Sequence, residues 1–174
     1  FTSLPYGYYF VTSELGSVVT ISNFSQNIKI IDKNQAAGLT CKEVSSTGTE
    51  GSWAENNDAG IGDTVYFRIE AFVPKFNGDK KVFEYTFTDT LADGLTLDEE
   101  SVDVKLGGVS ISKDIEYTIS IDGQVMTISI RPNEYIIYPD DPSIEISYQA
   151  AVNEYAAHKN TNTVSMSWTE FDPA

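Results

Sequence analysis

The sequence predicts an all-β fold, a sandwich of antiparallel strands. Apolar and polar residues alternate in many short runs along the chain. Turn-forming Gly, Asp, Asn and Pro residues separate these runs, and no stretch has convincing helical periodicity. Short, evenly spaced strands bounded by turns are typical of β-sandwiches.

The predicted strands fall into two groups along the chain. The first group contains "YYFVTS" and "SVVTIS", joined as a hairpin through "ELG", and then "NIKIID". A polar seam follows at "DKNQAAG", residues 32–38. The strands predicted after this seam are numerous enough to pair among themselves in one domain. We therefore expect a main domain over residues 35–174 and a separate segment over residues 1–34.

The strands of the main domain alternate clearly. They are expected at "LTCKEVS", "TVYFRIEAFVP", "KVFEYTFTDTL", "SVDVKL", "IEYTISI", "VMTISIRP", "SIEISYQAAV" and "NTVSMSW". In the second of these, Val65, Phe67, Ile69 and Ala71 share one face. Two alternating runs around "DG", at residues 122–123, predict a hairpin.

Composition excludes several classes of protein. The 174 residues are 41% hydrophobic, which is enough for a core, and carry a net charge of −15 from 11 basic and 26 acidic side chains. Such a surface repels nucleic acid and anionic membrane. No apolar run is long enough to span a bilayer. Because Cys41 is the only cysteine, no disulfide can form within the chain.

Signatures of enzymes and metal sites are scarce. The only histidine is His158, in the polar stretch "AAHKN", and phosphate-binding and Cys/His metal motifs are absent from the sequence. "WAENNDAGIGD" and "YPDDPS" offer oxygen ligands for calcium, but neither matches a defined loop, so ordinary turns are the preferred interpretation. We expect no enzymatic turnover, no cofactor and no metal.

Three polar side chains fall on the inward faces of predicted strands. Lys42 shares the face of Val44, Asp89 alternates with aromatic residues, and Asn162 alternates with apolar residues. Each could instead lie at a strand end and reach water, but isolated burial of any one is costly, and the three have complementary chemistry. The aromatic residues that share the face of Asp89 are Phe83, Tyr85 and Phe87.

This combination predicts the formation of an amide bond within the chain. Burial beside aromatic rings lowers the pKa of a lysine and favours the neutral, nucleophilic amine. A buried Asp89 can stay protonated, polarise the carbonyl of Asn162 and shuttle protons to the departing ammonia. The expected product is an isopeptide bond between Lys42 and Asn162, formed once and without turnover.

The motifs around these residues resemble those of a known family, the isopeptide-forming domains of Gram-positive sortase-assembled pilins and cell-wall adhesins. The likeness is to the CnaA-like, or fimbrial D2, type and covers roughly residues 38–172. It implies an Ig-like sandwich, with Lys42 and Asn162 joined, Asp89 as the acid, and Asn160 as an alternative acceptor of the same parity. The motifs are "CKEV", "IGDTVYFRIEAFVP", "YTFTDTLADGLT" and "IEISYQAAV…NTNTVSMSW".

The resemblance also implies a setting for the chain. Residues 1–34 resemble the closing strands of a preceding pilin domain, so that the chain looks like a piece of a longer protein. In "IIDKN", Lys33 is a candidate for sortase-made linkage between subunits. Because Asp32 replaces the proline of the related "YPKN" motif, a solvated lysine between domains is the preferred interpretation.

Two functions remain open from the sequence. The first is a structural module of an extracellular pilus on the cell wall, with other pilin subunits and sortase as partners. The second is a domain of a cell-wall adhesin that binds a host matrix protein or a glycan. For the second, "NEYIIYPDDP" with Tyr135 and Tyr138 is the place where a binding surface is expected.

Overall fold

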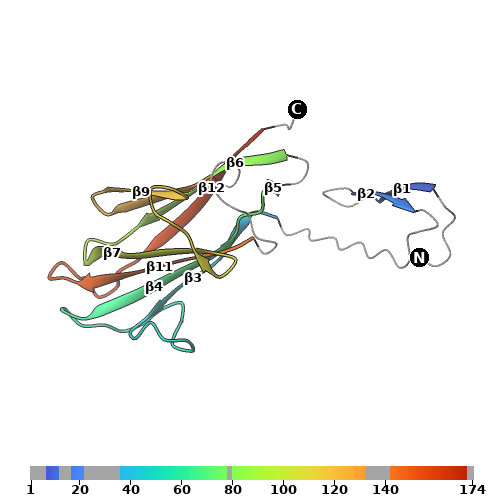
Figure 1. Cartoon of the computed structure of the whole chain (residues 1–174). Coiled ribbons are helices and arrows are strands. Elements are labelled where there is room, and N and C mark those ends of the chain that lie inside the picture. The colour runs from blue at the N-terminus through green and yellow to red at the C-terminus, as the bar shows by residue number, and fades with distance from the viewer. Residues whose placement is uncertain (1–6, 12–16, 22–35, 78–79, 132–141, 172–174) are drawn as a thin grey trace.

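The chain is described by a computed structural model that covers residues 7–11, 17–21, 36–77, 80–131 and 142–171. These residues contain twelve β-strands and no helix (Figure 1). The all-β prediction is therefore confirmed. Accordingly, the described ranges hold no helix of the length and apolarity needed to cross a membrane.

The strands form two antiparallel five-stranded sheets that face each other, and a separate hairpin (Figure 1). The first sheet contains, in spatial order, β3 (Gly38–Ser45), β4 (Thr64–Phe72), β11 (Ser143–Val152), β7 (Leu95–Leu106) and β8 (Val109–Ser110). The second contains β12 (Thr163–Phe171), β6 (Lys80–Thr90), β10 (Val125–Ile130) and β9 (Tyr117–Asp122), with β5 (Phe76–Asn77) paired to β6. The hairpin contains β1 (Gly7–Val11) and β2 (Ser17–Ile21).

The core lies between the two large sheets and follows the predicted alternation. Val65, Phe67, Ile69 and Ala71 of β4 are all buried, as expected from their shared face. They pack with the inward residues of the other strands, and each fully buried large side chain stabilises the fold by about 1.5–3 kcal/mol. The buried residues include Ile144 and Ile146 of the neighbouring strand β11 and, from the opposite sheet, Phe87, Ile128 and Ile130.

One inward-facing prediction on β6 is wrong. Phe83 is 47% exposed, whereas its neighbour Val82 is buried. The cause is a β-bulge, because β12 pairs Thr169 with Glu84 and then Glu170 with Val82, leaving Phe83 as the additional residue. An additional residue reverses the parity on one side of the bulge.

The other differences from the predictions are one longer strand and two additional short strands. The strand expected at residues 101–106 begins at Leu95, because the acidic run "LDEES" conceals its alternation. The short strands β5 and β8 were not expected. The hairpin around residues 122–123 is confirmed, with Asp122 paired to Val125 and Gly123 at a φ of 58°.

The N-terminal segment is described in part. β1 and β2 pair with each other from Gly7↔Ile21 to Val11↔Ser17, so the predicted hairpin is confirmed. The strand expected at "NIKIID" and most of the seam at residues 32–38 lie outside the described residues.

Gly94, in the turn between β6 and β7, provides a test of this packing. A Cβ added at Gly94 would collide with the backbone of Ala156 and with the side chain of Asn160. We expect Gly94→Ala to lower the free energy of unfolding by about 1–3 kcal/mol. Gly38→Ala is the control, because a Cβ at Gly38 meets open space. Urea unfolding checks the comparison, and equal stability of the two variants would contradict the close approach.

Candidate functional site

Lys42, Asp89 and Asn162 meet between the two sheets. Lys42 lies on β3, at the edge of the first sheet, whereas Asp89 lies on β6 of the second sheet and Asn162 directly precedes β12. The Nζ of Lys42 is 2.5 Å from Oδ1 of Asp89 and 2.5 Å from Oδ1 of Asn162. The cluster therefore connects the edge strands of the two sheets, β3 and β12.

The surroundings of Lys42 are largely closed to water. Its side chain is 13% exposed, and that of Asp89 is 2% exposed. The Nζ lies 5.5 Å from the ring centroid of Phe67 and 5.8 Å from that of Tyr148. Burial lowers the pKa of Lys42 to about 8, although the neighbouring Asp89 carboxylate acts in the opposite direction. This amine loses its proton more readily than a solvated lysine does.

Tyr148 of β11 completes the cluster. Its hydroxyl donates to Oδ2 of Asp89 at 2.6 Å and accepts a hydrogen bond from Nδ2 of Asn162 at 2.6 Å. Burial raises the pKa of Tyr148, and the Asp89 carboxylate raises it further, so the hydroxyl keeps its proton. The Tyr148 ring is stacked on that of Phe67, with centroids 5.1 Å apart.

Sequence reasoning did not identify Tyr148, although a signal was present. In "SIEISYQAAV" this tyrosine alternates with Ile144 and Ile146, and all three are buried in the structure. The same parity rule that singled out Asp89 places a polar hydroxyl on an apolar face here. A tyrosine on such a face is usually an ordinary core residue, so parity alone does not assign it to a site.

The other residues expected to contribute do not join the cluster or cannot be placed. The side chain of Asn160 forms hydrogen bonds within its own loop. Its Oδ1 accepts from the backbone N of Ala157 and its Nδ2 donates to the carbonyl of Ala157, both at 3.0 Å. Lys33, Tyr135 and Tyr138 lie outside the described residues. Asn160 does line a groove of about 690 Å³ that also borders Lys42 and Asn162.

The two acidic turns considered for calcium differ in how far they are described. In "WAENNDAGIGD", Oδ2 of Asp63 accepts a hydrogen bond of 2.7 Å from the backbone N of Gly60. This contact belongs to an ordinary turn. The acidic residues of "YPDDPS" lie outside the described part of the chain.

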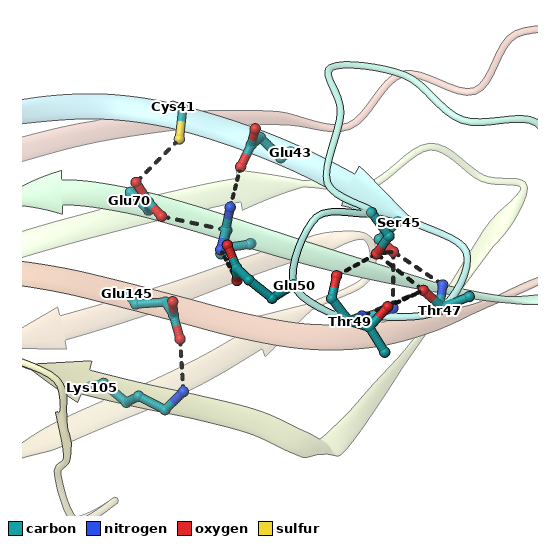
Figure 2. A network of polar contacts seen from close by, with 12 residues as sticks. Cys41, Glu43, Ser45, Thr47, Thr49, Glu50, Glu70, Lys105 and Glu145 are labelled. Atoms are coloured by element: carbon teal, nitrogen blue, oxygen red, sulfur yellow. Dashed lines mark hydrogen bonds and ion pairs between the residues drawn. The ribbon is translucent and has the colours of Figure 1, made fainter.

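A second polar cluster lies on β3 and β4 (Figure 2). The ligand atoms of Cys41, Glu43 and Glu70 lie within 4.8 Å of one another. Both carboxylates are ion-paired with Arg68, at 2.7 Å for Glu43 and 3.4 Å for Glu70. Burial raises the pKa of the Cys41 thiol, which disfavours the thiolate that metals bind. We interpret this cluster as an ion-pair network.

Comparison with known proteins identifies the family. Residues 61–170, well over half of the chain, match the family described as Gram-positive pilin backbone subunit 2, Cna-B-like domain. The chain belongs to this family. The predicted resemblance to Gram-positive pilins is thus confirmed. The family description carries the label Cna-B-like, whereas the sequence motifs resembled the CnaA-like type.

Individual relatives agree with the pilin family. The fimbrial subunit type 2 of Actinomyces naeslundii is 26% identical over 113 residues, which cover 64% of this chain and 21% of that protein. The pilus backbone of Streptococcus pneumoniae superposes with a TM-score of 0.53 at 14% identity, over 74% of this chain and 31% of its own. The N-terminal domain of a Streptococcus gordonii adhesin gives a TM-score of 0.52 at 25% identity, over 62% and 26% of the two chains.

The chain matches only part of the length of each of these relatives. The chain spans about a fifth of the fimbrial subunit that it matches. Pilin backbones are structural subunits of Gram-positive pili, generally without enzymatic activity, and pili lie on the cell surface. The Ig-like sandwich of this chain is the fold of such backbones.

Proposed function

We propose that this pilin domain is a structural module of a surface pilus, stabilised by an isopeptide bond between Nζ of Lys42 and the side-chain carbonyl carbon of Asn162. The observation that carries the proposal is the buried contact of Lys42 with both Asp89 and Asn162, each at 2.5 Å. Family membership supports the structural role, and the chemistry of the cluster supports the bond.

Asp89 has the role of a proton carrier in this reaction. In the folded precursor the Lys42 ammonium passes one proton to the Asp89 carboxylate, which gives a neutral amine and a neutral acid. Because the interior solvates charges poorly, this transfer costs less there than it would in water. The charge of the pair as a whole does not change.

The neutral amine then attacks the carbonyl carbon of Asn162. The new C–N bond forms as the carbonyl becomes a tetrahedral centre, and Asp89 polarises its oxygen. Asp89 gives its carboxyl proton toward the leaving nitrogen and accepts one proton from the attacking nitrogen, so that it ends the step as an acid. The original C–N bond breaks, ammonia departs and the carbonyl re-forms, so that protons and electrons balance.

Folding supplies the remaining requirements of the reaction. The strands hold amine and amide in contact, which replaces a bimolecular encounter by a reaction within one molecule. The groove beside Lys42 and Asn162 offers the ammonia a route to solvent. Because the nucleophile and its acceptor are consumed, the reaction occurs once.

The bond would stabilise the domain in two ways. It joins residues 120 positions apart. By analogy with a disulfide that closes a loop of this size, it contributes about 5 kcal/mol to the free energy of unfolding. It also connects β3 to the last strand, β12, so tension applied through the chain meets a covalent bond between these edge strands.

The structural role also suggests how the two parts of the chain belong to a longer pilin and which partners they have. We propose that residues 35–174 form the cross-linked domain and that residues 1–34 belong to a preceding pilin domain. Among the described strands, β1 pairs only with β2, which supports this division. Other pilin subunits are the proposed partners at the cell surface, with sortase as the enzyme that joins them and Lys33 as a candidate linkage residue.

A second function is favoured by one observation, the likeness to the Streptococcus gordonii adhesin domain. On this alternative the domain binds a host matrix protein or a glycan. Binding of the purified chain to a collagen surface or a glycan array, with loss of binding on substitution of Tyr135 and Tyr138, would support it over a purely structural role.

Intact mass tests the bond directly. We expect the folded chain to be lighter than its sequence by one ammonia, and a branched tryptic peptide to contain both Lys42 and Asn162. Asn162→Ala should keep the full mass of its own sequence. Asn160→Ala is the matched control and should still lose ammonia. Correctly folded wild-type protein without the mass loss would exclude the bond, and a branch at Asn160 would move the acceptor.

Removal of the acid tests the role of Asp89. Asp89→Ala should fold but retain its ammonia, because the amine and the leaving group lose their proton carrier. Without the closed loop, the free energy of unfolding should fall by about 5 kcal/mol in chemical denaturation. Asp103→Ala, which removes an acid from the half-exposed ion pair with Lys105, should cross-link normally. Full cross-linking of Asp89→Ala would remove Asp89 from the mechanism.

The pH dependence of bond formation distinguishes proton transfer from simple orientation. Burial lowers the pKa of Lys42 to about 8, so below that pH Lys42 carries the proton that it passes to Asp89, and above that pH this proton is lost to solvent. We expect the rate of ammonia loss during refolding to fall as pH rises through about 8, because an Asp89 carboxylate has no proton to deliver. A rate that rises through the same range would show that only the free amine matters.

A further inference from the structure

The hydrogen bonds of the cluster form a closed ring of four side chains. Lys42 contacts Asp89 and Asn162, and Tyr148 contacts the same two residues from the other side. We propose that Tyr148 is a further catalytic residue, whose hydroxyl orients the Asn162 amide and relays the proton from Asp89 to the departing nitrogen. This inference rests on the proposed function and deepens it.

The orienting role follows from the two different ends of an amide. The hydroxyl of Tyr148 donates its only proton to Oδ2 of Asp89, so toward Asn162 it can only accept. Nδ2 of Asn162 can only donate, and it occupies this position at 2.6 Å. The amide oxygen is thereby directed to Lys42, whose Nζ is a donor. The reversed amide would place two donors against each other.

The two carboxylate oxygens of Asp89 contact different partners, and this arrangement supports a proton relay. Oδ1 contacts the attacking nitrogen of Lys42, whereas Oδ2 contacts the hydroxyl of Tyr148. The hydrogen bonds that the structure describes lead from Asp89 to the leaving nitrogen of Asn162 through Tyr148. A single carboxyl group can therefore accept on one side and donate on the other.

The relay operates in the tetrahedral intermediate, where Nδ2 has become an amine nitrogen whose lone pair can accept a proton. The carboxyl proton of Asp89 then lies on Oδ2, and the Tyr148 hydroxyl turns from Oδ2 toward Nδ2, which reverses both hydrogen bonds of the amide-orienting state. The Lys42 nitrogen gives a proton to Oδ1, and Oδ2 gives its proton to the oxygen of Tyr148. The hydroxyl of Tyr148 gives its own proton to Nδ2 of Asn162. The C–N bond to Nδ2 breaks and ammonia leaves, while Asp89 remains an acid and Tyr148 remains neutral.

The surroundings of Tyr148 suit this role. The residue is 2% exposed, and stacking on Phe67 fixes the plane of its ring. Its raised pKa, caused first by burial, means that the hydroxyl carries a proton to give. The pairing of β11 with β7 is irregular between Ser147 and Gln149, next to Tyr148. Irregular pairing of this kind occurs often beside functional sites, where it directs a side chain.

Tyr85 shows what an ordinary buried tyrosine looks like in the same core. Its hydroxyl donates to the backbone carbonyl of Pro74 at 2.6 Å, and burial raises its pKa as well. Tyr85→Phe therefore removes the same chemical group from the same core at a distance from the reacting atoms. It is the matched control for Tyr148→Phe, which keeps the stacked ring and loses only the hydroxyl.

The experiment follows refolding of the full chain in two signals, tryptophan fluorescence for folding and intact mass for ammonia loss. Tyr148→Phe should fold at the rate of the wild type and lose ammonia on the order of 10²-fold more slowly, the usual contribution of a general acid. Tyr85→Phe should lose ammonia at the wild-type rate. An unchanged rate in Tyr148→Phe overturns the inference and leaves the proposed bond intact, whereas a wild type that never loses ammonia overturns both.

A second measurement does not depend on the folding of Tyr148→Phe. Lys42→Met removes the nucleophile, so the Asn162 amide survives and its Nδ2 protons can be observed by NMR. Because Nδ2 is hydrogen-bonded to the Tyr148 oxygen, these protons should exchange with solvent at least tenfold more slowly than those of a control side-chain amide. The control is Asn56, which lies in an exposed loop. Equally fast exchange would exclude the orienting role.

Discussion

The contact between Lys42 and Asp89 is the constraint on which the rest of this domain depends. An ammonium and a carboxylate placed between two sheets lose their hydration, and breaking a buried pair by removing one partner is strongly destabilising. Here each charge has a further partner, since Asn162 accepts from Lys42 and Tyr148 donates to Asp89. The cluster is satisfied as a unit, which explains why polar chemistry occurs inside an otherwise apolar core.

The position of this contact in the fold relates it to mechanical function. β3 and β12 are edge strands of different sheets, and Lys42 reaches from one to the residue that precedes the other. Edge strands are held by hydrogen bonds on one side only, so they are the natural places for a sandwich to open under load. A covalent link in the proposed position strengthens the fold where non-covalent pairing is weakest.

The same features tie stability to chemistry. Burial in the core lowers the pKa of Lys42, and the stacked rings of Phe67 and Tyr148 form one wall of the site. The aromatic ring of Tyr148 belongs to that wall, and its hydroxyl belongs to the cycle of hydrogen bonds that joins the four side chains. The geometry of the cluster therefore depends on core packing, which brings Lys42, Asp89 and Tyr148 on their strands together with Asn162, just before β12.

The sequence by itself determined the fold class and most of the strands, and it placed Lys42, Asp89 and Asn162 on inward faces. Alternation at every second position is a local property of a strand, and it also shows when a polar residue replaces an apolar one. Parity could not place Phe83, because the additional residue of a bulge is defined by the partner strand β12. It could not separate Asn162 from Asn160, which have the same parity.

Only the tertiary structure decided which side chains meet. Asn160 bonds to the backbone of its own loop, whereas Asn162 reaches Lys42, 120 positions away in the chain. Tyr148 acquired its place in the cluster from β11, a strand that neither neighbours Lys42 on β3 nor belongs to the sheet of Asp89. The physical reason is that alternation specifies the face of a residue, whereas a site requires distances between faces, and these are set by the stacking of two sheets.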